Sequence, residues 1–380
     1  MQADPPATRA KQISSLMRVF FIRNPYSRKF NKILLYFCIM RRLSALMIAT
    51  LLLATGCNRE PQYIQISGFA QGGQYSVTCQ LPDVRRKDAL KKAVDDTLSA
   101  IDWSLSGYNK GSIISKINNG ENPPLDDIFV DVFELSMKIW RQSAGAFDPS
   151  CAPLFDLWGF GFTNGRMPSD AAIDSAMALV GMDRYSIRED VSGLRYLDRP
   201  AGGKINFNAI AQGYSCDVVA RVLEDFGCQN YMVSLGGELV CKGCSARGDE
   251  WRVWIDRPED GNNDSGLLKQ DVISVTDCGL VTSGNYRKFY VVDGKKYSHT
   301  IDPRSGRPVT HNLLSATVLA DDSATADALA TAMMVVGLER SQLMVASWQE
   351  NPYRGAYLVY GDQDDMKVWH TPGLKLESGN

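Results

Sequence analysis

The chain has 380 residues, of which 44% are hydrophobic and 22% are charged, a composition typical of a globular protein with one large domain or two ordinary ones. Lys and Arg number 41 against 43 Asp and Glu, so the formal net charge is -2 and the chain lacks the positive field of a nucleic-acid-binding protein. Its nine cysteines are scattered, unlike the dense framework of a small disulfide-rich domain. We therefore expect a domain with its own hydrophobic core and no nucleic-acid partner.

The N-terminal part has the pattern of a secretion signal. Arg41 and Arg42 precede the apolar run 43–54, which is followed by Ala-Thr-Gly and then Cys57. The apolar run is too short to span a bilayer comfortably. A cysteine directly after small residues resembles a bacterial lipobox, so Cys57 is expected to carry a lipid that anchors the domain in the cell envelope, facing the periplasm. Ordinary cleavage that leaves Cys57 free is the alternative.

Met40 stands just before the arginine pair, where an initiator would normally be found. We therefore interpret residues 1–39 as an over-extended gene start or a leader, and residues 40–57 as the signal peptide. The folded domain is expected to occupy residues 60–375.

The first half of this domain shows strand and helix patterns in turn. Alternating residues predict strands at 63–66 and 75–79, joined by a turn at Gly72 and Gly73. Apolar residues at helical spacing predict helices over 89–101 and 128–139. A third helix is expected to start after Ser169 and to run to Gly181, and a fourth to cover 211–226 and end at Gly227.

The second half is dominated by short strand-like segments with one helix among them. Strands are predicted at 231–235, 251–255, 272–275, 288–292, 297–301 and 314–319, and a helix at 324–336. A regular alternation of strand and helix is absent. The sequence therefore predicts one α+β domain with a largely antiparallel sheet and flanking helices.

The Cys-Lys-Gly-Cys segment is the one close cysteine pair. Cys241 and Cys244 have the spacing of a zinc half-site, a redox pair or a local disulfide, but no second pair with zinc spacing follows. For an exported domain we favour a disulfide within the turn or two plain thiols.

Three stretches are rich in glycine, aromatic and small polar residues, as loops that approach a ligand are. They cover residues 145–161, 206–217 and 282–286, the last with 297–306 close behind. Within and around them stand, in this order, GAFDPS with PLFDLWGFG, NFNAIAQGY, LGGEL, TSGNY, SHTIDPRSGRPV and ADALATA. These blocks, which lie between about Gly68 and Gly337, resemble the signature blocks of the ApbE family of FAD:protein FMN transferases. The resemblance implies a single T-fold-like or α/β-roll domain.

A metal site is predicted at Asp327 and Thr331. The two residues are four apart on the predicted helix and so lie on one face, where their oxygens suit Mg²⁺. The resemblance implies the backbone carbonyl of Ala209 as a third ligand. The alternative is that Asp327 caps or salt-bridges the helix and that Thr331 bonds to a carbonyl one turn back.

The resemblance also implies the reaction. A hydroxyl of an acceptor protein attacks the phosphorus of FAD next to riboflavin, AMP leaves, and Mg²⁺ neutralises the pyrophosphate oxygens. The base that takes the hydroxyl proton is expected to be His299, because it lies in the SHTIDP block, whereas His311 and His370 lie outside the blocks. The alternative for His299 is a structural residue that fixes its loop through Asp302.

Flavin binding is carried over from the family in the same way. It falls on seven positions: Tyr108, Ala146, Phe147, Asp148, Asn206, Gln212 and Thr300. Core packing is the alternative for Phe147 and Phe160, and it is the favoured interpretation of Trp158.

The chain also departs from the usual family pattern. Asn206 stands where an aspartate is usual, Gln212 where a lysine is usual, and Gln71-Gly72-Gly73 replaces Met-Gly-Thr. Because one acid and one base are lost together, the local charge stays balanced, and we expect a coordinated variant rather than an inactive site.

Two other functions remain open at this stage. A Mg²⁺-dependent FAD pyrophosphatase would use water in place of the acceptor hydroxyl, and a lipoprotein without activity would only bind FAD. The acceptor pattern Asp-x-x-Thr/Ser-Gly-Ala-Thr/Ser is absent from this sequence, so the expected acceptor is another protein. By resemblance it would be a subunit of a membrane redox complex, such as a sodium-pumping or electron-bifurcating reductase, or a flavin-carrying domain outside the cytoplasm.

Overall fold

The computed structural model describes Met40 and residues 62–160, 167–259, 268–286, 289–292, 295–348, 353–363 and 365–377. Residues 61–380 form one compact unit, and residues 1–60 are assigned to another. The expected signal peptide and Cys57 therefore lie outside the described residues, except for Met40, which is exposed. Within the described ranges no helix is both long enough and apolar enough to cross a bilayer.

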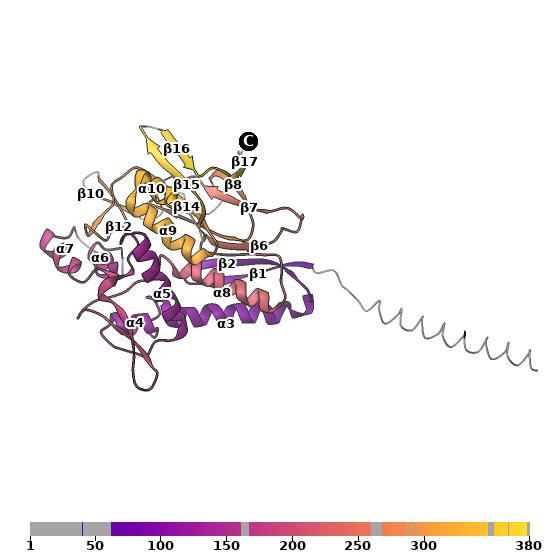
Figure 1. Cartoon of the computed structure of the whole chain (residues 1–380), viewed down its shortest axis with the longest axis horizontal. Coiled ribbons are helices and arrows are strands. Elements are labelled where there is room, and N and C mark those ends of the chain that lie inside the picture. The colour runs from indigo at the N-terminus through magenta and orange to yellow at the C-terminus, as the bar shows by residue number, and fades with distance from the viewer. Residues whose placement is uncertain are drawn as a thin grey trace, which may run out of the picture. The chain divides into compact units, whose positions relative to one another are not determined.

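An eight-stranded sheet forms the centre of the fold (Figure 1). Its strands, in spatial order, are β1 (Gln62–Ala70), β2 (Gly73–Leu81), β5 (Tyr231–Leu235), β6 (Glu238–Lys242), β9 (Cys278–Gly284), β14 (Leu313–Ala320), β15 (Tyr353–Asp362) and β16 (Asp365–His370). Every neighbouring pair is antiparallel. The prediction of an α+β domain with a largely antiparallel sheet is confirmed.

The β1–β2 hairpin shows how the sequence sets the sheet register. Ala70 faces Gly73 across a two-residue turn, in which Gln71 and Gly72 both have positive φ angles of 51° and 77°. A tight turn of this kind matches the right-handed twist of the strands. Along β2, alternate side chains from Tyr75 to Leu81 are buried, so one face of the strand points into the core.

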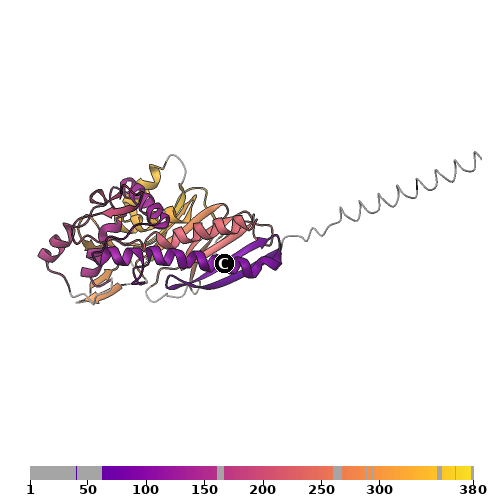
Figure 2. The ribbon, with the colours of Figure 1, turned by 90° about the horizontal axis from the view of Figure 1, so that it is seen from below.

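Helices cover one face of the sheet. The helices of the domain are α3 (Lys87–Leu105), α4 (Ile113–Asn118), α5 (Asp127–Gln142), α6 (Ala152–Leu157), α7 (Asp170–Met177), α8 (Ala211–Asp225), α9 (Ser323–Val336) and α10 (Leu338–Ala346), with short 3₁₀ turns at Val84–Arg86, Pro149–Cys151 and Met182–Arg184. α8 packs on β5 and β6, and α9 packs on β9 and β14. Figure 2 shows α3 running beside α8.

A second, smaller sheet covers the other face. It consists of β7 (Trp251–Asp256), β8 (Lys269–Val275) and β17 (Lys375–Glu377). Trp251 and Ile273 from this sheet share a core with Leu239 and Tyr357 from the main sheet. The domain therefore has three layers, which are the helices, the eight-stranded sheet and the small sheet.

Three short hairpins complete the described structure. They pair β3 (Ser186–Glu189) with β4 (Arg195–Asp198), β10 (Phe289–Val292) with β11 (Lys295–Ser298), and β12 (Ile301–Asp302) with β13 (Arg307–Pro308). The predicted strand 297–301 is wrong, because the chain leaves β11 after Ser298 and enters β12 at Ile301. His299 and Thr300 consequently lie in the connection between two hairpins.

Helix ends follow the expected signals in two cases out of three. Ser169 accepts a hydrogen bond from the Ala172 N–H and so caps α7, and Gly227 follows α8 with a φ of 86°. α7, however, ends at Met177 rather than near Gly181. Gly181 instead begins the next 3₁₀ turn, with a φ of 120°.

Candidate functional site

The N-terminus of α9 is held by two aspartates. Asp322 precedes the helix and accepts a hydrogen bond from the Thr325 N–H, while Asp217 on α8 accepts bonds of 2.8 Å from the N–H groups of Ser323 and Ala324. Burial, together with the charge of Asp322, raises the pKa of Asp217 to about 7. The helix is thereby fixed against α8 at its start.

α8 and β9 approach α9 unusually closely. A methyl group on Gly213 of α8 would lie 2.4 Å from the Ser323 carbonyl oxygen, and one on Gly279 of β9 would lie 2.4 Å from the Ser323 nitrogen. These positions therefore require glycine. α9 is rich in alanine, whose small side chains allow the neighbouring backbones to approach closely.

Asp327 and Thr331 lie on α9 as predicted, one turn apart and directed at neighbouring elements. Oδ2 of Asp327 accepts a hydrogen bond of 3.3 Å from the Gly213 N–H, and Oγ1 of Thr331 lies 3.4 Å from Oγ of Ser283 on β9. Asp327 is buried, and burial, followed by the charge of Glu238, raises its pKa well above the ordinary value. Ala209 lies in the turn that leads into α8, four residues before Gly213.

Glu238 is a site residue that the sequence analysis missed, although it lies in the LGGEL block. A methyl group on Gly236 would lie 3.0 Å from Oε2 of Glu238 and 2.6 Å from Nε2 of Gln212, so both side chains extend over this glycine. The hairpin turn at Gly73 packs against Gly236 as well, with its methyl position 3.3 Å from the Gly236 Cα. Gln71 in the same turn donates to Oγ of Ser215 at 2.6 Å.

The oxygens gathered here fit a hard divalent cation. Mg²⁺ binds carboxylates and neutral oxygens and retains water and substrate phosphate in its shell. Among the described residues, the Gly213 N–H gives the Asp327 carboxylate its one hydrogen bond, and a buried carboxylate of this kind requires compensating charge. The described ranges hold no group of three or more His, Cys, Asp or Glu side chains able to bind a metal, so any cation here would depend on hydroxyls, carbonyls, water and substrate.

The structure brings together the three stretches that are rich in glycine, aromatic and small polar residues. The Asn206 N–H donates to the Pro149 carbonyl at 2.8 Å, which joins the second stretch to the first. Nε1 of Trp158 donates to the Gly306 carbonyl at 2.8 Å, and the rings of Phe160 and His299 meet edge to face at 6.5 Å, which joins the first to the third. Gly161, the last residue of the first stretch, lies outside the described part of the chain.

The three histidines differ in how they are held. In His311, Nε2 donates to the Met334 carbonyl and Nδ1 accepts from the Leu313 N–H. The ring of His370 stacks on Tyr357. His299 is half-buried in the connection between β11 and β12, and the carboxylate of Asp302 beside it is held by two bonds from Arg304.

The predicted flavin residues have different surroundings. Tyr108 is 73% exposed in the loop after α3, so its ring is accessible for stacking. Ala146 and Phe147 are buried in the main core, which favours the core-packing interpretation of the Phe147 ring and leaves only its backbone for a ligand. Asp148 accepts bonds from Trp140 and Ser150, and burial raises its pKa.

Two further flavin candidates are also engaged within the protein. Oδ1 of Asn206 accepts a bond from the Asn208 N–H, and Thr300 donates to the buried Asn285 at 2.5 Å. Trp158 is buried and stacks on Tyr297, as core packing predicts.

Of the two interpretations favoured for Cys241 and Cys244, the structure agrees with two plain thiols and not with a disulfide within the turn. Cys241 lies on β6 and directly faces Cys278 on β9. The Cys244 thiol instead lies beside Asn230 and the Tyr63 hydroxyl.

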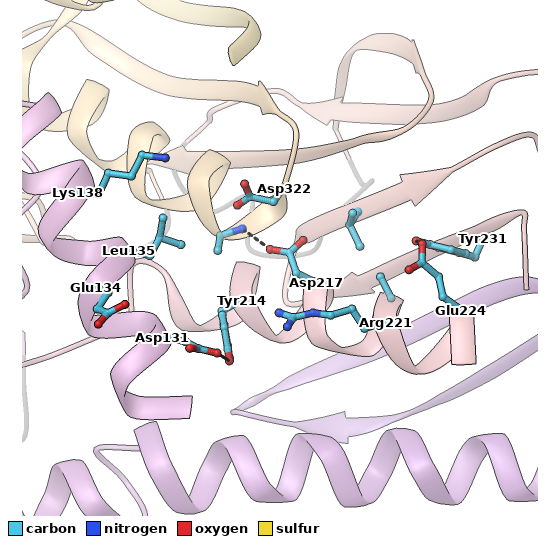
Figure 3. Close-up of a pocket in the computed structure, with 13 residues that line it drawn as sticks. Asp131, Glu134, Leu135, Lys138, Tyr214, Asp217, Arg221, Glu224, Tyr231 and Asp322 are labelled. Carbon is cyan, nitrogen blue, oxygen red and sulfur yellow. Dashed lines mark hydrogen bonds between the residues drawn. The ribbon is translucent and has the colours of Figure 1, made fainter. Parts of the chain in front are cut away.

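A separate cavity of about 630 Å³ lies between α5, α8 and the start of α9 (Figure 3). Its charged lining consists of Asp131, Glu134, Lys138, Asp217, Arg221, Glu224 and Asp322, and it includes none of the residues predicted for flavin, metal or base. Five carboxylates against two basic groups disfavour a pyrophosphate. We therefore place the candidate site at Asp327 and the three converging stretches.

Comparisons with known proteins give matches over most of the chain. The family model described as "ApbE family" matches residues 71–353. The chain is 31% identical to the FAD:protein FMN transferase of Salmonella typhimurium over 344 residues, covering 87% of this chain and 96% of the relative. It is 32% identical to the enzyme of the same name from Escherichia coli K12, covering 87% of this chain and 95% of the relative.

Solved structures show the same fold. The apo flavinyl transferase ApbE of Pseudomonas stutzeri superposes with a TM-score of 0.71 at 31% identity, covering 82% of this chain and 96% of that one. The flavin transferase ApbE of Vibrio cholerae gives a TM-score of 0.69 at 28% identity, with 82% and 97% covered.

Proposed function

The chain belongs to the ApbE family, and from that premise we propose that it transfers the FMN part of FAD to a threonine or serine hydroxyl of another protein, with Mg²⁺ as cofactor and AMP as the leaving group. The observation that carries this proposal is the convergence of the buried Asp327 and of Thr331 with the start of α8 and with Ser283. The blocks that resemble the family signatures surround this point. Relatives with the name FAD:protein FMN transferase match most of the chain.

In the proposed reaction Asp327, Thr331 and the Ala209 carbonyl would hold the cation, and Glu238 would add negative charge nearby. When bound, Mg²⁺ supplies positive charge to the pyrophosphate oxygens of FAD. The Gly213 N–H fixes the Asp327 carboxylate and keeps it directed at this point. As the acceptor oxygen bonds to the riboflavin-side phosphorus, the bond from that phosphorus to the bridging oxygen breaks, and AMP leaves with the bridging oxygen.

His299 is proposed as the base that accepts the proton of the acceptor hydroxyl. His299 lies beside Phe160. In contrast, His311 is hydrogen-bonded to a backbone carbonyl near the end of α9, and His370 stacks on Tyr357 in the outer part of the sheet. Aromatic and amide groups near the three stretches would orient the flavin, and the accessible ring of Tyr108 is suited to stacking on it.

The chain is further proposed to act at the cell envelope. The support is the signal-like segment before Cys57 and the small residues that precede this cysteine. A subunit of a membrane redox complex would then be within reach as acceptor. Membrane fractionation of the wild type and of Cys57→Ser tests the anchor, because the variant is expected in the soluble fraction and its recovery with the membrane would contradict lipidation.

The central experiment incubates the purified chain with FAD, MgCl₂ and an acceptor protein that carries the flavinylation pattern. The expected result is flavin fluorescence that stays with the acceptor on a denaturing gel and is lost with EDTA. His299→Asn is expected to abolish the transfer, and His370→Asn serves as the matched control that retains it. Free FMN and AMP without labelled acceptor would identify a pyrophosphatase, and FAD that survives with Mg²⁺ would identify a protein that only binds the cofactor.

A further inference from the structure

Four of the seven described cysteines meet in two pairs inside the protein. All seven are thiols in this structure. The first pair is Cys241 on β6 and Cys278 on β9, which are direct partners across the antiparallel ladder and are 1% and 2% exposed. Directly opposed residues of an antiparallel pair have Cα atoms about 4.5–5.5 Å apart, which lies within the roughly 4.4–6.8 Å that a disulfide needs.

The second pair joins two segments that are distant in sequence. Cys79 lies near the end of β2, opposite Tyr231 of β5, and Cys228 lies in the connection between α8 and β5. A backbone hydrogen bond of 2.8 Å from the Gln80 N–H to the Asn230 carbonyl holds the two segments together beside the pair. Both cysteines are buried in the same core.

In each pair the two thiols are chemically unequal. Contact with its partner raises the pKa of Cys79 and lowers that of Cys228, to which the charge of Arg86 also contributes. Contact with its partner raises the pKa of Cys241 and lowers that of Cys278, with a smaller contribution from Arg354. The thiolate is the nucleophile in disulfide exchange, and either member of a pair can attack the oxidant first.

We propose that Cys79 with Cys228 and Cys241 with Cys278 form two structural disulfides when the chain folds in the presence of an organic disulfide. In each pair one thiolate attacks the oxidant and releases its first thiol, and the partner thiol then attacks the mixed disulfide and releases the second. Two S–H bonds of the protein are replaced by one S–S bond, and the two electrons and two protons end on the two thiols of the reduced oxidant. Because the four sulfurs are buried in the native state, the bonds form during folding.

The two bonds would brace the strands that carry the candidate site. β6 starts at Glu238 and β9 extends to Ser283, so a link between Cys241 and Cys278 fixes the pairing of these two strands. The other bond fixes β2, whose turn packs on Gly236, to the end of α8. The bonds close loops of roughly 40 and roughly 150 residues, lengths at which a cross-link restricts the unfolded chain strongly.

The test is refolding of the full chain with reduced and oxidised glutathione, in parallel with refolding in excess reductant. After alkylation, the oxidised sample is expected to have four fewer reactive thiols, and peptide mapping to find the two stated links. Its melting temperature is expected to exceed that of the reduced sample by on the order of 10 °C. An unchanged thiol count, or a link between Cys241 and Cys244, would overturn the proposal.

Variants separate the bonds from ordinary core packing. Cys278→Ala and Cys228→Ala each remove one bond, so each is expected to reduce the difference in melting temperature between the oxidised and reduced forms to about half. Cys151→Ala is the matched control, because Cys151 is also buried but lies in a different core, and it is expected to keep the full difference. If all three variants show the same difference as the wild type, the proposed bonds do not exist.

Discussion

Gly213→Ala tests whether the close approach of α8 and α9 holds the candidate site together. The added methyl group would lie 2.4 Å from the carbonyl oxygen of Ser323, 2.7 Å from its carbonyl carbon and 2.9 Å from the Cα of Ala324. All three atoms belong to the backbone, so the contact cannot be relieved by rotation of a side chain. The start of α9 must move away from α8.

The expected loss of stability follows from three contributions. Alanine in a helix is favoured over glycine by about 1 kcal/mol. Overpacking against backbone costs about 1–3 kcal/mol. The movement also lengthens the bonds from Ser323 and Ala324 to the Asp217 carboxylate, and a hydrogen bond to a charged group contributes about 1.5–3 kcal/mol. We therefore expect the free energy of unfolding to fall by about 2–4 kcal/mol, with weaker Mg²⁺-dependent transfer because the Gly213 N–H moves away from Asp327.

Urea unfolding followed by tryptophan fluorescence measures this change. Gly361→Ala is the matched control, because a methyl group there meets only the Asn312 carbonyl oxygen, at 3.9 Å. The control is expected to keep the stability of the wild type to within about 1 kcal/mol. A Gly213→Ala chain as stable as the wild type would refute the argument from close packing.

Three further predictions address single side chains. Asp327→Asn removes a buried charge, so the free energy of unfolding of the variant in EDTA should rise by about 1–3 kcal/mol. In urea unfolding, Mg²⁺ at about 100 times its Kd should stabilise only the wild type, by about 2.7 kcal/mol. Equal stabilisation of both chains would exclude Asp327 as a ligand. Thr300→Val leaves the amide oxygen of the buried Asn285 without this donor and should cost about 1–3 kcal/mol, while Thr300→Ser should retain the bond; equal unfolding midpoints would contradict this role. Burial lowers the pKa of His311 below 6.5, so as the pH falls the unfolded chain takes up the imidazole proton before the folded chain does, and the folded state loses stability below about pH 6.5. His311→Gln should therefore lose less stability than the wild type between about pH 7.5 and about pH 5. An unchanged pH dependence would disprove the contribution of His311.

The sequence predicts the parts of the fold that depend on local patterns. Alternation in β2, the turn at Gly72, and Gly227 after α8 all depend on residues within a few positions of one another, and the structure agrees. The segment Thr282–Gly284 was grouped with the loops because it contains glycine and small polar residues, yet it forms the end of β9. There Gly284 has no space for a side chain, since its methyl position lies 2.5 Å from the ring of Tyr286.

Local sequence patterns do not predict contacts between segments that are far apart in the chain. The blocks that resemble the family led to Asp327, but its partner Gly213 is more than a hundred residues away in sequence, and the sequence contains no local signal for their hydrogen bond. The facing positions of Cys241 and Cys278 likewise depend on the register of β6 and β9, neither of which was predicted as a strand. The proximity of Cys241 to Cys244 in sequence therefore gives no indication that Cys278 faces Cys241.

The crossing of α8 and α9 explains why carboxylates gather at a place that must be tightly packed. Glycine at position 213 lets the helices touch, and burial then raises the pKa of both Asp217 and Asp327. Asp217 is compensated by two N–H groups at the start of a helix, where the helix dipole also favours negative charge. Within the described ranges, Asp327 accepts one hydrogen bond, of 3.3 Å from the Gly213 N–H, and the charge of Glu238 lies nearby. The proposed cation, bound together with the substrate, would offset the charge left at Asp327. The two aspartates on this pair of helices therefore differ in how their charge is compensated, which separates the structural carboxylate from the one proposed for chemistry.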